Sequence, residues 1–133
     1  MTAIMIVDDS SVTRKVIKKH ISSGPYASAS LLEAADGEQA LEMFKSGTQP
    51  DVILSDWNMP KMNGLEFVRH LRDYEQTLGR TLEQRVKIIM ITTEGTIDKV
   101  TEAMASGVNE YIVKPFTADT LNKMLKKVLP AQM

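Results

Sequence analysis

The feature that most constrains the fold is an alternation of short apolar runs with segments of helical periodicity, which occurs five times in 133 residues. The first run, residues 3–7, is apolar throughout, a pattern typical of a strand buried on both faces. Further apolar runs occur at 29–34, 52–54, 87–92 and 111–113. After each run, apolar residues recur every three or four positions, as on one face of a helix. We therefore expect an α/β fold in which five strands alternate with five helices and form a parallel sheet covered on both faces.

Composition narrows the functional classes. A formal net charge of -1 gives the chain no general positive field that would attract nucleic acid or anionic lipid. The absence of cysteine excludes disulfides, thiolate zinc sites and thiol nucleophiles. No run approaches the roughly 18 apolar residues of a membrane span, and the run at 3–7 is too short for a signal peptide. We expect a single domain over residues 1–133, without an attached output domain and located in the cytoplasm.

Polar residues and glycines mark the ends of the expected helices. Ser10 or Ser11 is placed to cap the first helix, and Thr117 to cap the last. Gly107 follows the fourth helical pattern, where a glycine commonly ends a helix. The polar stretch 73–86 either extends the third helix or forms a loop.

Acidic side chains follow the first and third strands. Asp8 and Asp9 come directly after the run at 3–7, and Asp56 follows the run at 52–54. If the strand order is 2-1-3-4-5, these strand ends are neighbours at the point where the order reverses, which is where open parallel sheets bind ligands. Three carboxylates so close together repel one another unless they are protonated or bind a hard cation such as Mg²⁺.

A hydroxyl and an ammonium group are expected at the same edge. Thr92 ends the fourth strand and Lys114 follows the fifth. Together with the acids they provide a site for a phosphoryl group, because a metal ion and a lysine balance its charge and a hydroxyl donates to one of its oxygens. Each motif alone has an ordinary explanation, such as a capping turn or an exposed acid, but their joint occurrence favours the functional interpretation.

Five segments carry a resemblance to a known family. They are residues 6–10 (IVDDS), 55–60 (SDWNMP), 63–64 (NG), 91–94 (ITTE) and 113–116 (VKPF). Together they resemble the signature of response-regulator receiver domains, over residues 4–129. The closest likeness is to the chemotaxis regulators of that family. The resemblance implies a flavodoxin-like (βα)5 fold with strand order 2-1-3-4-5 and a role as a phosphorylation switch in a two-component pathway, with chemotaxis as the expected pathway.

The resemblance assigns the acidic residues to phosphorylation and to metal binding. Asp56 would be the phosphoacceptor, taking the phosphoryl group from a histidine kinase or a small donor such as acetyl phosphate. Asp9 and Asp56 would bind Mg²⁺ directly, with the backbone carbonyl of Asn58, whereas Asp8 would act mostly through water. The protein would not be an enzyme acting on an external substrate, although it would catalyse its own phosphorylation and dephosphorylation.

Further residues receive roles through the same resemblance. Lys114 would pair with the phosphoryl oxygens and Thr92 would donate a hydrogen bond to one of them. Movement of Thr92 would open space into which Tyr111 turns, which makes these two the switch residues. Asn58 and Glu94 would adjust the rate at which water hydrolyses the acyl phosphate. The family commonly holds the peptide bond after Lys114 in the cis form.

The expected partner surface comprises the fourth helix, fifth strand and fifth helix. The residues assigned to it are Ile97, Tyr111, Lys123 and Met124. This face is more apolar than in chemotaxis regulators, because Ile97 and Met124 occupy positions where those proteins carry lysines. The implied partners are a histidine kinase of the chemotaxis type as phosphodonor, a flagellar motor switch protein or another phosphorylation-dependent target, and a phosphatase. We expect a monomer.

The remaining charged positions have simpler interpretations. His20 and His70 are isolated, and we take both as surface or structural residues. Basic residues of the first helix are expected on one solvated face, beside the site and within reach of a docking kinase: Arg14, Lys15, Lys18 and Lys19.

Other functions remain as alternatives. A phosphohydrolase with an aspartate nucleophile needs a second acid two residues later, where this chain has Asn58, and turnover of phosphate esters dependent on Asp56 would favour that class. A receiver that binds partners without phosphorylation would tolerate Asp56→Asn. A stand-alone receiver outside chemotaxis, or one that acts as a phosphate sink, would share the whole site.

Overall fold

Alternating apolar side chains of the strands form two separate clusters, one on each face of the sheet. The computed structural model describes residues 2–129. Met5 and Val7 pack on one face and Ile4 and Ile6 on the other, as expected for strands covered on both sides. Along the chain, the elements are β1 Ala3–Val7, α1 Ser11–Ser22, β2 Ser30–Ala34, α2 Gly37–Lys45, β3 Val52–Ser55, α3 Gly64–Thr77, η1 Leu82–Gln84, β4 Lys87–Thr92, α4 Ile97–Ser106, β5 Glu110–Val113 and α5 Ala118–Val128.

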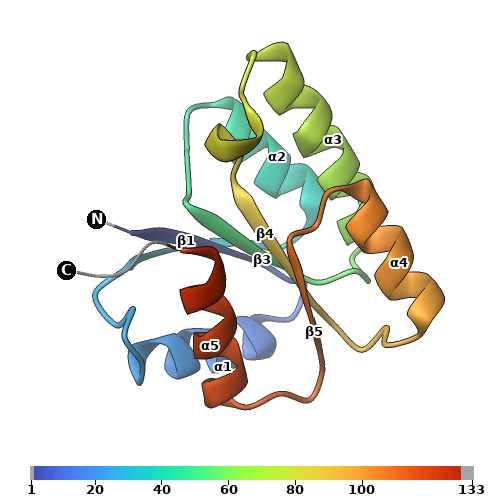
Figure 1. The fold of residues 1–133 in the computed structure, drawn as a ribbon. Coiled ribbons are helices and arrows are strands. Elements are labelled where there is room, and N and C mark those ends of the chain that lie inside the picture. Colours follow the sequence, from blue (N-terminus) through green and yellow to red (C-terminus); the bar gives the residue numbers. More distant parts are fainter. Residues whose placement is uncertain (1, 130–133) are drawn as a thin grey trace.

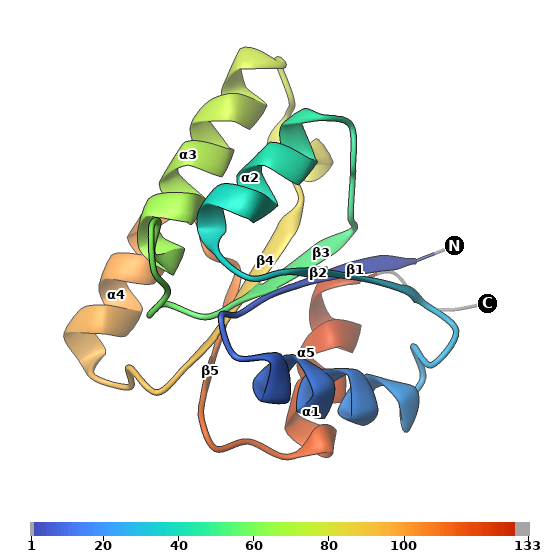
Figure 2. The same ribbon diagram turned by 180° about the vertical axis from the view of Figure 1, so that it is seen from behind.

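The sheet is parallel, with strand order β2-β1-β3-β4-β5, which confirms the expected order. Helices α1 and α5 cover one face, whereas α2, α3 and α4 cover the other (Figures 1 and 2). Val7 at the end of β1 is in register with Ser55 at the end of β3. The residues that follow these two strands therefore emerge next to each other.

Each helix begins at a side chain that accepts a hydrogen bond from the backbone N–H three residues later. Ser10, rather than Ser11, caps α1, and Thr117 caps α5 as expected. The caps of the other helices are Asp36, Asn63 and Thr96. Gly107 ends α4 with a φ of 114°, a left-handed conformation that glycine adopts without strain. No helix within residues 2–129 is long and apolar enough to cross a bilayer.

Gly64 allows α3 to begin directly against the loop that follows β3. Its backbone N–H donates to the Trp57 carbonyl at 2.7 Å. A Cβ atom at this position would lie 2.0 Å from the Asp56 backbone oxygen. The close approach of α3 therefore depends on the missing side chain, and it fixes the backbone immediately after the predicted phosphoacceptor.

We expect Gly64→Ala to lower the free energy of unfolding by about 1–3 kcal/mol, because the added methyl group overlaps backbone atoms that have little room to move. Urea-induced unfolding followed by circular dichroism measures the change. Gly95→Ala is the matched control, since its Cβ would meet only the exposed Val113 side chain. Equal stability of the two variants would contradict the steric argument.

Stretch 73–86 proves to be both helix and loop. α3 continues to Thr77, and η1 follows before β4. The carboxylate of Glu75, on the buried side of α3, is fully inaccessible to solvent. It accepts hydrogen bonds from Arg72 Nη1 at 2.6 Å and from the Val86 backbone N–H at 2.7 Å, and it lies 3.5 Å from Arg80 Nη1. Glu75 therefore holds both ends of this segment together.

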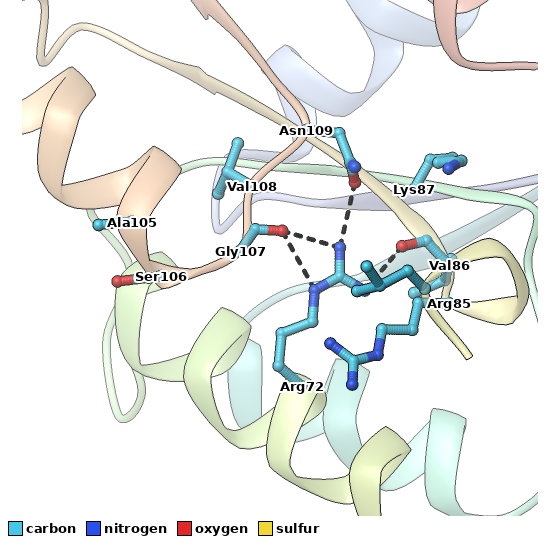
Figure 3. A pocket seen from close by; sticks show the side chains of 10 residues that line it. Arg72, Arg85, Val86, Lys87, Ala105, Ser106, Gly107, Val108 and Asn109 are labelled. Atoms are coloured by element: carbon cyan, nitrogen blue, oxygen red, sulfur yellow. Dashed lines mark hydrogen bonds between the residues drawn. The ribbon is translucent and has the colours of Figure 1, made fainter. Parts of the chain in front are cut away.

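Arg72 links α3 to the connection between α4 and β5 (Figure 3). Its Nε and Nη2 donate to the Gly107 carbonyl at 3.1 and 2.8 Å, and Nη2 also donates to Asn109 Oδ1 at 3.1 Å. Nη1 donates to the Val86 carbonyl at 2.8 Å as well as to Glu75. These bonds fasten the edge of the sheet where β4 and β5 begin.

Candidate functional site

The topology places Asp8 and Asp56 at neighbouring strand ends. Asp8 directly follows β1, and its N–H donates to the Ala34 carbonyl of β2 at 3.1 Å. Asp56 directly follows β3, and its N–H donates to the Val7 carbonyl of β1 at 2.9 Å. Backbone hydrogen bonds thus hold both residues in register just beyond the sheet. This position is where the strand order reverses.

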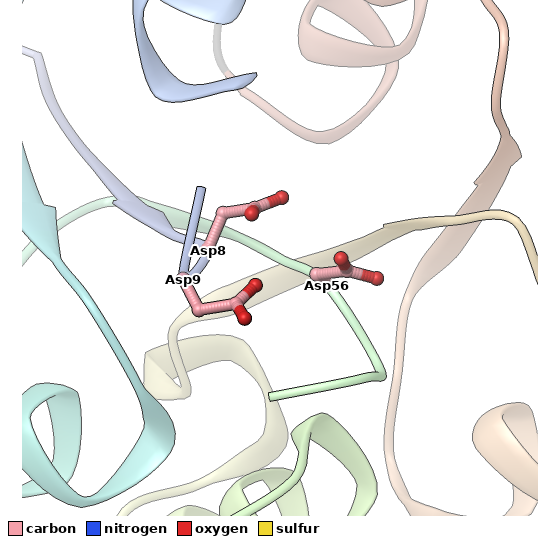
Figure 4. A group of neighbouring side chains, drawn as sticks. All are labelled: Asp8, Asp9 and Asp56. Atoms are coloured by element: carbon pink, nitrogen blue, oxygen red, sulfur yellow. The ribbon is translucent and has the colours of Figure 1, made fainter. Parts of the chain in front are cut away.

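Asp8, Asp9 and Asp56 form the acidic cluster expected from the sequence (Figure 4). One carboxylate oxygen from each residue lies within 4.8 Å of those of the other two. Asp8 is buried, with 2% of its surface exposed, whereas Asp56 is partly buried and Asp9 is exposed. A cluster of three carboxylates, buried at Asp8 and open to solvent at Asp9, fits a hard divalent cation that keeps several water molecules, as Mg²⁺ does.

Lys114 reaches this cluster from the end of β5. Its backbone N–H donates to the Thr92 carbonyl at 2.8 Å, and the following peptide bond to Pro115 is cis, as expected. Its Nζ donates to Asp8 Oδ2 at 3.0 Å and to Asp56 Oδ2 at 3.1 Å. Burial alone would lower the pKa of Lys114, but its hydrogen bonds with Asp8 and Asp56 and their charges outweigh burial, so its pKa is raised.

Asp8 is the carboxylate that burial affects most clearly. Burial raises its pKa, although the Ser10 N–H donates to Oδ1 at 2.9 Å and Lys114 pairs with Oδ2. The charge of Asp56 adds to the increase. The folded protein therefore holds Asp8 in a site where the ionised form is disfavoured, and a divalent cation would relieve this cost.

The two predicted switch residues meet the same residue, Glu94. Thr92 is fully buried, and its Oγ1 accepts a hydrogen bond from the Glu94 N–H at 3.3 Å. The Tyr111 hydroxyl donates to the Glu94 backbone carbonyl. Burial and the charges of Glu94 and Asp56 raise the pKa of Tyr111 to about 12, so its hydroxyl remains a donor at neutral pH. Tyr111 is half-buried in this arrangement.

Asn58 and Glu94 contact each other through their side chains. Asn58 Nδ2 donates to Glu94 Oε1 at 3.2 Å, and Asn58 is exposed. Both residues are expected to adjust hydrolysis of the acyl phosphate, but the sequence does not predict this contact. The two residues are 36 positions apart and come from separate loops, so no local pattern indicates that they touch.

The interpretation of the basic residues of α1 as one solvated face holds for Lys15 and Lys19 but not for Arg14 and Lys18. Arg14 and Lys18 form ion pairs with Glu33 of β2, both at 2.9 Å, whereas Lys15 and Lys19 are exposed. Arg14 also donates to the Asp8 backbone carbonyl, which brings it to the edge of the acidic cluster. The i,i+4 spacing of Arg14 and Lys18 places them on one side of the helix, but their acidic partner on another element could not be inferred.

Residues of the predicted partner surface differ in exposure. Ile97, at the start of α4, is 83% exposed, and Lys123 on α5 is exposed and paired with Asp119 at 3.1 Å. Met124 is only half-buried and packs against the apolar cluster between α5 and the sheet. Ile97 is therefore the most accessible apolar side chain of this face.

The two histidines fit their interpretation as surface or structural residues. The ring of His20 packs edge-on against Phe116 at a centroid distance of 5.7 Å, and His70 is exposed.

Comparison with known proteins agrees with this geometry. The sequence model of the family described as "Response regulator receiver domain" matches residues 4–126. The chain is 41% identical to chemotaxis protein CheY1 of Helicobacter pylori over 126 residues, which cover 95% of each chain. It is 38% identical to chemotaxis protein CheY of Pseudomonas aeruginosa over 94% of each chain. The structure of chemotaxis protein CheY4 of Vibrio cholerae is similar with a TM-score of 0.82 and 36% identity, over 97% of this chain and 99% of that one.

Fold, family match and relatives agree over almost the whole chain. The flavodoxin-like fold is the one expected. Four of the five segments that carried the resemblance lie at the ends of β1, β3, β4 and β5, and the fifth, residues 63–64, begins α3. The chain belongs to the response regulator receiver domain family.

Proposed function

We propose that the protein is a single-domain response regulator that accepts a phosphoryl group on Asp56. The observation that carries this proposal is the bridging position of Lys114, whose ammonium group lies within 3.1 Å of a carboxylate oxygen of Asp56 and also bonds Asp8. A cation in this position neutralises negative charge at the carboxylate where a phosphoryl group would be attached.

In the proposed transfer, an Asp56 carboxylate oxygen attacks the phosphorus atom of a phosphohistidine. A new oxygen–phosphorus bond forms, the phosphorus–nitrogen bond breaks, and the imidazole leaves with the electron pair. Lys114 is placed to interact with the phosphoryl oxygens, and the Thr92 hydroxyl group to donate a hydrogen bond to one of them. Hydrolysis reverses the modification when water attacks the same phosphorus atom.

The proposed cofactor is Mg²⁺. Asp9 and Asp56 would hold it directly with the backbone carbonyl of Asn58, and Asp8 would contribute mainly through water. When bound, the ion neutralises the charge that develops on the phosphoryl oxygens during transfer. The acidic cluster within 4.8 Å and its exposed member Asp9 support this assignment, because they offer oxygen ligands on the solvent side.

Phosphorylation would be read through Thr92 and Tyr111. The phosphoryl group carries about -1.5 to -2 of charge beside Lys114, where the free Asp56 carboxylate carries about -1. A shift of Thr92 towards the phosphoryl group would disturb the hydrogen bond that Thr92 accepts from the Glu94 N–H. The loop that contains Glu94 would then move, and its carbonyl is the acceptor of the Tyr111 hydroxyl. Partners would detect the change on α4, β5 and α5, where Ile97 offers an apolar contact.

The proposed pathway is chemotaxis, in the cytoplasm. Several of the similar proteins are named as chemotaxis proteins. By analogy, the phosphodonor is a histidine kinase, the target is a flagellar motor switch protein or another phosphorylation-dependent protein, and a phosphatase shortens the signal. The same site would also serve a receiver in another pathway or a phosphate sink, which assays with purified partners distinguish.

Fluorescence of Trp57 tests the proposal. Trp57 is the only tryptophan; it is buried, directly follows Asp56, and has Lys99 Nζ 4.9 Å from its ring centroid. We expect one change on adding Mg²⁺ and a second on adding acetyl phosphate, the second decaying with time and absent from Asp56→Asn. Intact-mass spectrometry checks that the second change accompanies a covalent phosphoryl group. A fluorescence change on adding acetyl phosphate that persists in Asp56→Asn would overturn the proposal. So would a wild-type protein that gains no phosphoryl group from acetyl phosphate or from a kinase.

We expect Asn58→Leu to prolong the acyl phosphate several-fold. The substitution removes the amide that bonds Glu94 and places a bulky apolar side chain two residues after Asp56, which should hinder the approach of water to the acyl phosphate. Decay of the phosphorylated protein after removal of the donor gives the lifetime. Asn58→Gln, which keeps an amide, should change it less. An unchanged lifetime in Asn58→Leu would exclude this residue from control of hydrolysis.

A further inference from the structure

A second polar site lies at the edge of the sheet opposite Asp56. It is a hollow of about 500 Å³ between the start of β4, the connection from α4 to β5, and the segment after α3 (Figure 3). Its lining includes the basic residues Arg72, Arg85 and Lys87, and none of the described residues that line it is acidic. The predicted phosphorylation chemistry uses none of these groups.

Arg72 forms one wall of the hollow but is not available to a ligand. Its guanidinium group makes five hydrogen bonds, to Glu75, Val86, Gly107 and Asn109. Five is the number of N–H donors that a guanidinium group has. Arg72 is therefore a structural residue that shapes the hollow and adds to its positive potential.

Arg85 differs from Arg72 because its side chain has no partner within residues 2–129. Its Nε atom is buried and makes no hydrogen bond. A buried donor without an acceptor is costly, and more so when it belongs to a charged group. The side chains of Arg85 and Arg72 line the same hollow (Figure 3). Glu75 balances the charge of Arg72, whereas Arg85 forms no ion pair within residues 2–129, so its charge is not balanced. An anion in the hollow would balance the charge of the guanidinium group, while the buried Nε atom itself stays out of its reach.

Two further residues with donor groups, Lys87 and Asn109, line the same hollow. Lys87, at the start of β4, forms no ion pair within the described part of the chain. Asn109 uses its Oδ1 to accept from Arg72 and from the Ile88 N–H at 2.8 Å, which fixes the amide and leaves its Nδ2 donors unused. The side chains of Leu82 and Val108 provide apolar walls.

We propose that this hollow binds a small oxyanion, through the guanidinium group of Arg85, the ammonium group of Lys87 and the amide of Asn109. A guanidinium group matches the oxygens of both carboxylates and phosphoryl groups in pairs, and a lysine adds a point charge. The apolar walls favour an anion that carries an organic group. This site is separate from the acidic cluster, which follows β1 and β3 at the opposite edge of the sheet.

Amide chemical shifts of the full chain test the proposal in the absence of Mg²⁺, so that no phosphate is recruited to the acidic cluster. Inorganic phosphate and acetate are titrated separately at constant ionic strength. We expect saturable shifts at Val86, Lys87 and Asn109. Tighter binding of phosphate would identify a phosphoryl ligand, and tighter binding of acetate a carboxylate ligand.

Variants decide whether the named residues hold the anion. Arg85→Gln and Lys87→Gln should each weaken binding about tenfold, because each removes a charged hydrogen bond. Lys126→Gln, which removes an exposed lysine from α5, is the matched control and should leave binding unchanged. Shifts that do not saturate with either anion, or affinities equal in Arg85→Gln and wild type, would overturn the proposal.

Discussion

Glu75→Ala is expected to lower the free energy of unfolding by about 3–5 kcal/mol, the largest loss of stability that we predict for one side chain. The substitution removes a fully buried carboxylate that accepts from Arg72, lies close to Arg80 and binds the Val86 N–H. It leaves a partly buried guanidinium group without its counter-charge and a buried N–H without an acceptor. Both losses weaken the same segment, residues 73–86, which should therefore unfold as one unit.

Urea-induced unfolding measures this effect, with two variants for comparison. Glu75→Gln keeps an acceptor for the Val86 N–H and should lose less stability than the alanine variant. Gln76→Ala changes the neighbouring exposed position of α3 and should alter the free energy of unfolding by less than about 0.5 kcal/mol. If Glu75→Ala were no less stable than Gln76→Ala, the buried carboxylate would have no structural role.

Asp8→Asn is expected to have opposite effects on stability and on metal binding. At pH 7 without metal it should raise the free energy of unfolding by on the order of 1 kcal/mol, because burial disfavours the ionised Asp8 carboxylate and the charge of Asp56 adds to this cost, while Lys114 keeps its other partner. Affinity for Mg²⁺ should fall about 10- to 100-fold, as for residues that hold a metal through water.

The pH dependence of stability gives an independent measure of the same residue. Because the pKa of Asp8 is raised in the folded state, that state binds its proton more tightly than the unfolded chain, whose value is near 3.8. The free energy of unfolding should therefore fall as pH rises from about that value through the folded pKa. In Asp8→Asn, the part of this decrease in the free energy of unfolding that is due to Asp8 should be absent. Identical pH profiles for wild type and variant would refute the shift.

The fold and most of the site could be predicted because they depend on strand order. Once the strands are parallel and ordered 2-1-3-4-5, Asp8 and Asp56 must emerge side by side, and Lys114 follows the last strand at the same edge. These relations need no knowledge of side-chain conformation. The caps at Ser10 and Thr117 were predictable for a similar reason, since they depend only on local sequence.

Contacts between separate loops and helices could not be predicted. The bond from Asn58 to Glu94 and the pairing of Arg14 with Glu33 depend on how distant segments are placed. Glu75 did leave a signal, because it lies four residues after Leu71 on the apolar side of α3. A carboxylate there contradicts the apolar pattern, and only the partners provided by Arg72 and Val86 explain it.

The bonds of Arg72 to Gly107 have a mechanical consequence for α4. They anchor the last turn of this helix, whereas its first turn, with Ile97, extends into solvent. A helix of 10 residues is about 15 Å long, so a pivot of about 10° around the anchored end moves the free end by about 2.6 Å. α4 can thus pivot about Gly107, and a displacement near Glu94, just before its free end, moves Ile97 at the surface that a partner would contact while the last turn stays in place.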